Sequence, residues 1–156
     1  MTETMTPGQL CADLLLRVRS QRTACFSGLG VVFYRNLTAL PHVALGVQST
    51  PHPPLPVYGS TAISEVLAGI ADLNSPWHDG FHLVDARIAA LTHLSQFLSP
   101  DLQYAGDIPS ARPFGARQMA ALLASRANGI VEVGLITPSG EASYFIDGIQ
   151  HLMSFE

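Results

Sequence analysis

The sequence predicts an α/β fold in which a mixed central β-sheet is flanked by helices. Segments with a helical spacing of apolar residues interleave with short apolar runs typical of strands, and the chain closes with a hairpin pattern. The chain has 156 residues, of which 47% are hydrophobic, and this is enough to build one buried core. We therefore expect a single domain over residues 1–156.

The first part of the chain is predicted to contain a helix and two strands. Thr6 followed by Pro7 is typical of a helix start, and leucines and a valine then recur every four residues. This spacing predicts an amphipathic helix over 7–20. The run LGVVFYRN, residues 29–36, is bounded by turn residues and predicts a strand, and HVALGVQ, residues 42–48, is a second candidate.

The middle of the chain opens with a proline-rich connection. Residues 49–60 carry four prolines, so we expect no regular structure there. A helix with Ser60 as its N-cap should follow, because apolar residues recur at helical spacing. It must end by Asn74–Ser75, since Pro76 disfavours helical geometry in the residue before it. GFHLVDA, residues 80–86, alternates like a strand.

The C-terminal half contains one ambiguous segment. RIAALTHLSQFL, residues 87–98, is a helix by its composition and a strand by its place directly after a strand and a short turn. Residues 99–115 contain three prolines and are predicted to be a loop. A helix is expected from Ala116 to Asn128. The hairpin consists of IVEVGLIT, a PSGE turn and ASYFIDGI, over residues 130–149.

Composition and charge exclude several classes of function. The net charge of −4 is spread without runs, so we expect no nucleic-acid and no membrane-surface role. The N-terminus lacks the pattern of a signal peptide, and two cysteines, Cys11 and Cys25, are too few for a zinc site or a disulfide framework. We expect a cytoplasmic protein. The low charged fraction of 13% favours a surface covered by a partner subunit.

Two short motifs in the second half carry chemistry-bearing side chains. The first is NSPWHDGF, residues 74–81, in which a histidine, an aspartate and a glycine precede a strand. The second is FGAR, residues 114–117, which opens the helix predicted from Ala116. A strand, a short turn and a closing strand that reaches Asp147–Gly148 come after this helix. An Asp-Gly pair alone is typical of any turn, so the order of the two motifs is what carries information.

This order resembles the catalytic domain of the diadenylate cyclase (DAC) family, as found at the front of the DNA-integrity scanning protein. The family carries an N-P-L-H-D-G-A segment and, later, a G-T-R-H-R segment that opens a helix. The resemblance is clearest over residues 60–148, and the strand at GLGVVFYRN extends it toward the N-terminus. It implies a DAC-like arrangement of a mixed sheet flanked by helices.

The resemblance also implies a ligand class. The family joins two ATP molecules into cyclic di-AMP across two facing subunits, using a divalent metal. It therefore implies an adenine nucleotide or cyclic dinucleotide as ligand, Mg²⁺ or Mn²⁺ as cofactor, and a homo-oligomer. Fold resemblance does not by itself establish activity.

In the first motif, Asp79 matches the family's aspartate, which is linked to the metal and to the attacking ribose hydroxyl. It is therefore the candidate catalytic and metal-binding residue, and also a candidate ligand-binding residue. His78 and Gly80 are candidate ligand-binding residues, because an imidazole beside a carboxylate is readily oriented and glycine admits close approach. Phe81 departs from the family, where alanine stands. Its ring either turns into the core or fills part of the ligand pocket.

In the second motif, Gly115, Ala116 and Arg117 match the family's G-T-R, and all three are candidate ligand-binding residues. The first amides of a helix favour a phosphate, and a guanidinium can grip it with two hydrogen bonds. Gln118 stands for the family's histidine, and the next residue is a methionine in place of its second arginine. Gln118 is also a candidate for ligand contact, and Arg112 is a candidate substitute for the missing cation.

The turn before the last strand departs furthest from the family. There the family carries glutamates that help to hold the metal, whereas residues 136–140 contain no carboxylate. Glu141 follows, but it aligns with another family position. A magnesium site usually includes one or two carboxylates, and Asp79 is the one that the sequence offers.

Four hypotheses about function follow. The leading one is a nucleotide-binding or nucleotide-sensing domain whose catalytic motifs are depleted. The second is an active, divergent diadenylate cyclase. The third is an interaction module whose pocket is closed by Phe81. The last is metal-dependent hydrolysis by His78, Asp79, His82 and His93, in which His78 and His82 would share one face of a strand.

Overall fold

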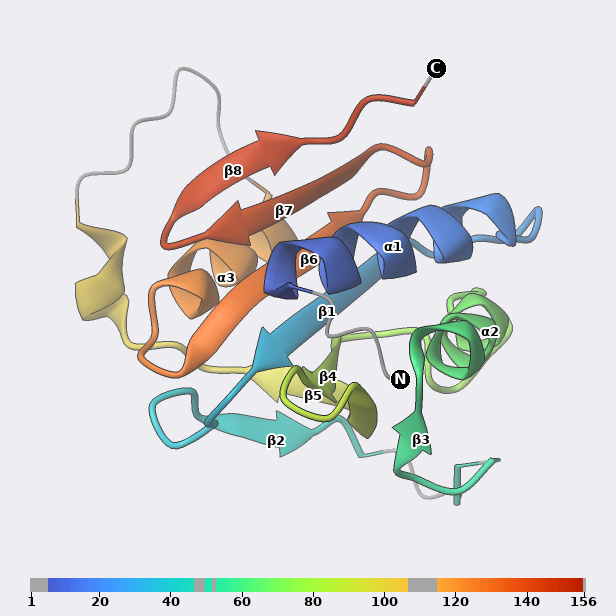
Figure 1. Ribbon diagram of the computed structural model, residues 1–156, viewed down its shortest axis with the longest axis horizontal. Helices are drawn as coiled ribbons and strands as arrows, with labels where there is room; N and C mark the ends of the chain where they lie inside the picture. Colours follow the sequence, from blue (N-terminus) through green and yellow to red (C-terminus); the bar gives the residue numbers. More distant parts are fainter. Residues whose placement is uncertain (1–5, 47–49, 52, 107–114, 156) are drawn as a thin grey trace.

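The computed structural model describes residues 6–46, 50–51, 53–106 and 115–155. Eight strands form one mixed sheet in the order β2-β5-β4-β1-β6-β7-β8, and β3 pairs with β5 beside this path. Helices α1 and α2 cover one face of the sheet and α3 lies behind the other face (Figure 1). The α/β class with a mixed, helix-flanked sheet is thereby confirmed.

The bounds of the elements in chain order are as follows: α1 (Pro7–Ser20), β1 (Leu29–Tyr34), β2 (His42–Ala44), β3 (Val57–Tyr58), α2 (Ser60–Ile70), β4 (Phe81–Asp85), β5 (Ala90–Leu98), the 3₁₀ helix η1 (Leu102–Ala105), α3 (Ala116–Ser125), β6 (Ile130–Ile136), β7 (Ala142–Ile146) and β8 (Ile149–Leu152).

Strand β1 lies between β4 and β6 and pairs with both. It runs parallel to β4, with Val31 opposite His82, and antiparallel to β6, with Leu29 opposite Ile136. The start of β1, the start of β4 and the end of β6 therefore meet at the same end of the sheet. This arrangement brings together segments that are more than 100 residues apart in the chain.

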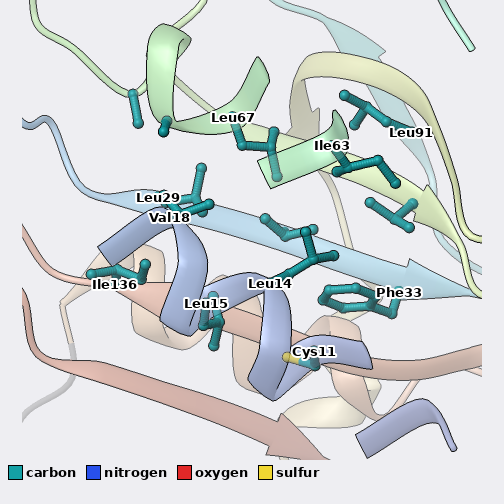
Figure 2. Close-up of a cluster of buried hydrophobic side chains, with 14 of the residues drawn as sticks. Cys11, Leu14, Leu15, Val18, Leu29, Phe33, Ile63, Leu67, Leu91 and Ile136 are labelled. Carbon is teal, nitrogen blue, oxygen red and sulfur yellow. The ribbon is translucent and has the colours of Figure 1, made fainter. Parts of the chain in front are cut away.

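Two apolar cores fill the space on either side of the sheet. In the first, Leu14 and Leu15 of α1 and Leu67 of α2 pack on Leu29 and Phe33 of β1 (Figure 2). In the second, a set of α3, sheet and loop residues packs together: Val32, Tyr34, Leu40, Phe81, Leu83, Leu98, Ala121, Leu122, Leu123, Ala124, Ala127, Val133, Leu135 and Phe145. A strand buried on both faces needs apolar residues at every position, and this explains the continuous run in β1.

Several predicted elements are present as expected. Helix α1 occupies residues 7–20, and the Thr6 amide donates a hydrogen bond to Oε1 of Gln9 at 2.9 Å. The ambiguous segment 87–98 forms β5, so the strand interpretation is confirmed. The turn into it is tight, and the Arg87 amide donates to Oδ1 of Asp85 at 2.9 Å.

The boundaries of α2 differ from the prediction. Its N-cap is Gly59 and not Ser60, whose hydroxyl instead donates to Oδ2 of Asp13 on α1 at 2.6 Å. The helix ends at Ile70, before the limit set by the proline, because the next residues join a bridge to the segment that precedes β1. Both differences arise from contacts with distant parts of the chain.

Other elements are shorter than predicted or are divided in two. The proline-rich stretch is not wholly irregular, because Val57 and Tyr58 form β3. The candidate strand over 42–48 begins as predicted but β2 ends at Ala44, and α3 ends at Ser125 rather than Asn128. The loop predicted over 99–115 contains η1. The closing segment is two strands, because Asp147 and Gly148 take positive φ angles and reverse the chain.

Candidate functional site

The aspartate of the first motif and the arginine of the second motif lie next to each other. Asp79 lies two residues before β4 and Arg117 is in the first turn of α3, and Oδ1 of Asp79 lies 3.8 Å from Nη2 of Arg117. The Asp79 side chain is 73% exposed, so this ion pair contributes little to stability. A weak pair of this kind leaves the guanidinium available to a stronger anionic partner.

Gly28, just before β1, allows Arg117 to reach across the end of the sheet. A methyl group on Gly28 would lie 3.0 Å from Nη1 of Arg117 and 2.9 Å from the carbonyl oxygen of Ile136. Gly28 also has a φ of +83°, which favours glycine. The sequence marks this glycine as the boundary of a strand, but gives no sign that it lies against the arginine.

The N-terminus of α3 supplies backbone amides beside the guanidinium. Gly115 is the N-cap, and its own amide donates to Oε1 of Gln118 at 3.2 Å. The amides of Ala116, Arg117 and Gln118 belong to the first turn, where helical geometry provides no intrahelical acceptor. Together with the helix dipole, these amides favour an anion at this end of α3.

A cavity of about 300 Å³ opens between the start of α3 and the end of β6. Its lining consists of residues 115–118 on one side and Leu135–Pro138 on the other. This volume is at the lower end of the range for small-molecule sites. The predicted residues Gly115, Ala116, Arg117 and Gln118 therefore share one cavity, whereas Arg112 lies outside the described residues.

Phe81 turns into the core and does not line this cavity. Its ring is 5% exposed and belongs to the second core, directly under Gly30. A methyl group on Gly30 would lie 2.8 Å from Cδ1 of Phe81. The absence of a side chain at Gly30 makes room for the ring inside the protein, so Phe81 takes no part in the wall of this cavity.

Gly80 has a packing role in the structure. Its φ is +78°, and a methyl group there would meet Cδ1 of Leu45 at 2.6 Å and the carbonyl oxygen of Gln96 at 2.7 Å. Atoms of Leu45 and Gln96 therefore occupy the space that the absence of a side chain at Gly80 leaves free. Gly80 also orients its neighbour, since its amide donates to Oδ1 of Asp79 at 2.8 Å.

The histidines around the first motif lie in different environments. His78 is in the turn before β4, so it does not share a strand face with His82, contrary to the prediction. His82 is buried, and its Nδ1 accepts a hydrogen bond from the Ser95 amide at 3.1 Å. Burial, followed by the nearby charge of Arg117, lowers the pKa of His82 to about 3, so this imidazole is neutral.

His93 belongs to a separate contact. Its ring packs edge-on against His42, and its Nδ1 lies 2.8 Å from the hydroxyl of Thr92. Within the described ranges, no group of three or more histidine, cysteine, aspartate or glutamate side chains is arranged to hold a metal ion. The four residues of the hydrolysis hypothesis are therefore not brought together as a metal site.

The donor set also fits a resident divalent cation poorly. Asp79 is the one carboxylate of the first motif, and its Oδ1 already faces a guanidinium and its neighbour's amide. The wall of the cavity formed by Leu135–Pro138 carries no carboxylate. Cations such as Mg²⁺ require oxygen ligands, and nothing in this wall replaces the family's glutamates.

Comparisons with known proteins bear on the fold. No protein-family model matches the sequence, and no curated protein matches it. A crystal structure of a hypothetical membrane-spanning protein from Bacillus cereus is similar, with a TM-score of 0.62 and 19% identity over 95% of this chain and 63% of that one. This chain thus spans less than two thirds of that protein.

A crystal structure of DacA from Staphylococcus aureus, a diadenylate cyclase, is similar as well. The TM-score is 0.57 at 16% identity, and the match covers 94% of this chain and 88% of that chain. At this level of identity the similarity establishes a DAC-like fold. In the part of the chain that the structure describes, every helix is too short or too polar to cross a membrane.

Proposed function

We propose that this chain is a nucleotide-binding or nucleotide-sensing domain of DAC-like fold with depleted catalytic motifs. Its ligand is an adenine nucleotide or a cyclic dinucleotide, bound in the cavity between the start of α3 and the end of β6. The observation that carries the proposal is that Arg117 and the first amides of α3 line one cavity, with Asp79 next to Arg117. The similarity of the fold to that of a diadenylate cyclase supports the choice of ligand class.

Binding begins with a phosphate group at the N-terminus of α3. The helix amides donate hydrogen bonds to it, and Arg117 contributes a forked pair of donors. The phosphate replaces Asp79 as the partner of the guanidinium, because it accepts two parallel hydrogen bonds where Asp79 lies 3.8 Å away. The less polar part of the ligand lies against the cavity wall formed by Leu135–Pro138.

The same residues are too few for efficient nucleotidyl transfer. Joining a hydroxyl to an α-phosphate needs an acceptor for the hydroxyl proton and cations that spread the phosphate charge. The described part of the site supplies one carboxylate and one guanidinium. Met119, which stands for the family's second arginine, packs against the second core and carries no charge. Ligand binding without turnover follows from this donor set.

Calorimetric titration with ATP and with cyclic di-AMP, each with and without Mn²⁺, tests the proposal. We expect binding by the natural chain and a loss of about tenfold or more in affinity for Arg117→Gln, because one charge-assisted contact is removed. Arg17→Gln is the matched control, since Arg17 pairs with Asp13 on α1, away from the cavity. The absence of binding for all nucleotides would exclude this function.

An active cyclase is the second candidate, and the contact between Asp79 and Arg117 is the observation that favours it. Incubation with ATP and Mn²⁺ followed by chromatography separates the two functions. A peak of cyclic di-AMP that disappears in Asp79→Asn would support the cyclase. We expect no product, because the metal ligands and the second cation are missing from the described site.

A further inference from the structure

Glu132 is a buried carboxyl group on the face of the sheet opposite α3. It lies on β6 and is 0% exposed, and neither of its oxygens has a hydrogen-bond partner among the described residues. Glutamate is almost never fully buried unless it is paired, because desolvation of the charged form is costly. This residue is independent of the nucleotide site, so the inference below does not rest on the proposed function.

Helix α1 covers Glu132 closely. Cys11 of α1 is 0% exposed and belongs to the same apolar cluster as Leu14 and Phe33 (Figure 2). A methyl group on Gly134, the next residue of β6 on this face, would lie 3.0 Å from Sγ of Cys11. The contact between α1 and β6 therefore leaves no side-chain space between them at this point.

The other charged and titratable groups of α1 are engaged elsewhere. Asp13 accepts hydrogen bonds from Arg17 and from Ser60, and Arg19 donates to the carbonyl oxygen of Gly140 at the opposite end of α1. The buried side chains in the described part of the chain include no arginine. Helix α1 thus offers Glu132 a thiol and apolar groups but no cation.

The neighbouring strands offer no counter-charge either. The residue of β1 opposite Glu132 is Phe33, and the hydroxyl of Tyr34 is hydrogen-bonded to Thr92. On β7 and β8, Tyr144 and His151 stack on each other. Burial raises the pKa of Glu132 to about 7, and contacts with Cys11 offset only part of this rise. The pKa of the Cys11 thiol is raised as well, first by burial and second by the neighbouring Glu132.

We propose that Glu132 makes the docking of α1 on the sheet sensitive to proton concentration. The neutral acid fits the dry contact with α1, whereas the carboxylate has no cation beside it and the Cys11 contacts offset only part of its desolvation. Ionisation therefore drives the first half of α1 away from β6 so that water can reach the carboxylate. Cys11 lies on that half of α1 and becomes accessible together with it.

The test measures the accessibility of Cys11 in the full chain carrying Cys25→Ser, which removes the exposed thiol. N-ethylmaleimide labelling is followed at about pH 6 and about pH 8.5, and each rate is divided by the rate of the unfolded protein at the same pH. This ratio cancels the intrinsic titration of the thiol. Protection of Cys11 should fall by about tenfold between the two conditions, because opening is linked to loss of one proton.

Glu132→Gln in the same background is the matched variant, since its side chain has nearly the same shape and never ionises. Its protection should change by less than about twofold over the same interval. Equal pH dependence of the two proteins would overturn the proposal. Hydrogen exchange of the natural chain gives a readout that does not depend on any variant. After correction for intrinsic rates, the α1 amides should lose protection at the higher pH while α3 keeps its own, and equal loss in both helices would overturn it.

Discussion

Two carboxyl groups, Asp79 in the segment before β4 and Glu132 on β6, differ in burial and in partners, and this difference separates their roles. Asp79 is 73% exposed and lies 3.8 Å from a guanidinium, whereas Glu132 is 0% exposed and has no hydrogen-bond partner among the described residues. The exposed group can exchange its partner at small cost because water solvates both states. The buried group cannot, so its protonation is coupled to packing. The first therefore suits a binding site and the second suits a conformational switch.

Phe81→Ala would test most severely whether the core and the site are separate. The ring is buried under Gly30, so its removal should leave a cavity and lower the free energy of unfolding by about 3–5 kcal/mol. Urea unfolding measures this loss, and titration of the folded variant with nucleotide measures binding. New or tighter binding in Phe81→Ala, at unchanged stability, would return the ring to the ligand pocket.

Glu132→Gln should produce the next largest effect, and its sign depends on pH. The pKa of Glu132 is about 7 in the folded state and 4.5 for an ordinary glutamate, so the folded state binds more protons between these values. The natural chain therefore loses stability as pH rises from 4.5 to 7 and stays less stable above that. At about pH 8, Glu132→Gln should be more stable by about 3 kcal/mol, the equivalent of this shift.

The control for this prediction is the same comparison at about pH 4.5, where the neutral acid is present in the natural chain. There the stabilising effect of Glu132→Gln should vanish. Denaturant unfolding at the two pH values measures both quantities. A difference between the two proteins that is the same at both pH values would contradict the assignment of Glu132 as a buried neutral acid.

Gly28→Ala tests the other side of the comparison, the end of the sheet that holds Arg117. The φ of +83° and the contacts with Ile136 and the guanidinium leave no room for a methyl group, so we expect a loss of about 1–3 kcal/mol and weaker nucleotide binding. Gly69→Ala is the control. Nothing lies within 4 Å of the position of its added methyl group, and alanine there should stabilise α2 by about 0.5–1 kcal/mol.

Asp79→Asn is expected to have the smallest effect on binding. Removing the carboxylate frees Arg117 from its resting partner, so nucleotide affinity should stay the same or rise by no more than about fivefold, within the range of an exposed ion pair. Calorimetric titration beside the natural chain measures this change. A large fall in affinity would instead mean that Asp79 holds the ligand, directly or through a cation.

The main strands and the motifs could be predicted because their signals are local. The continuous apolar run of β1, the helical spacing in α1 and the Asp-Gly and Gly-Ala-Arg segments depend on neighbouring residues alone. The predicted partners Asp79 and Arg117 come together in the structure. The sequence could not separate helix from strand in β5, since alanine and leucine fit both and only pairing with β4 and β2 decides.

The missed features depend on contacts between distant segments. Ser60 has the residue type of an N-cap, but its hydroxyl donates a hydrogen bond to Asp13 on another helix. Gly28 is important because a side chain some 90 residues later lies against it. Glu132 within IVEVG would point to solvent in a sheet with one open face, but α1 covers that face and buries it.

The amino-acid sequence by itself determined the α/β class, the helix over 7–20 and the residue types available to a nucleotide site, since periodicity and turn chemistry are read within a few residues. Only the tertiary structure decided that Phe81 points inward, that Gly28 lies against Arg117 and that Glu132 lies dry beneath α1. Burial and counter-charge are properties of the whole packed chain, so no local pattern can specify them.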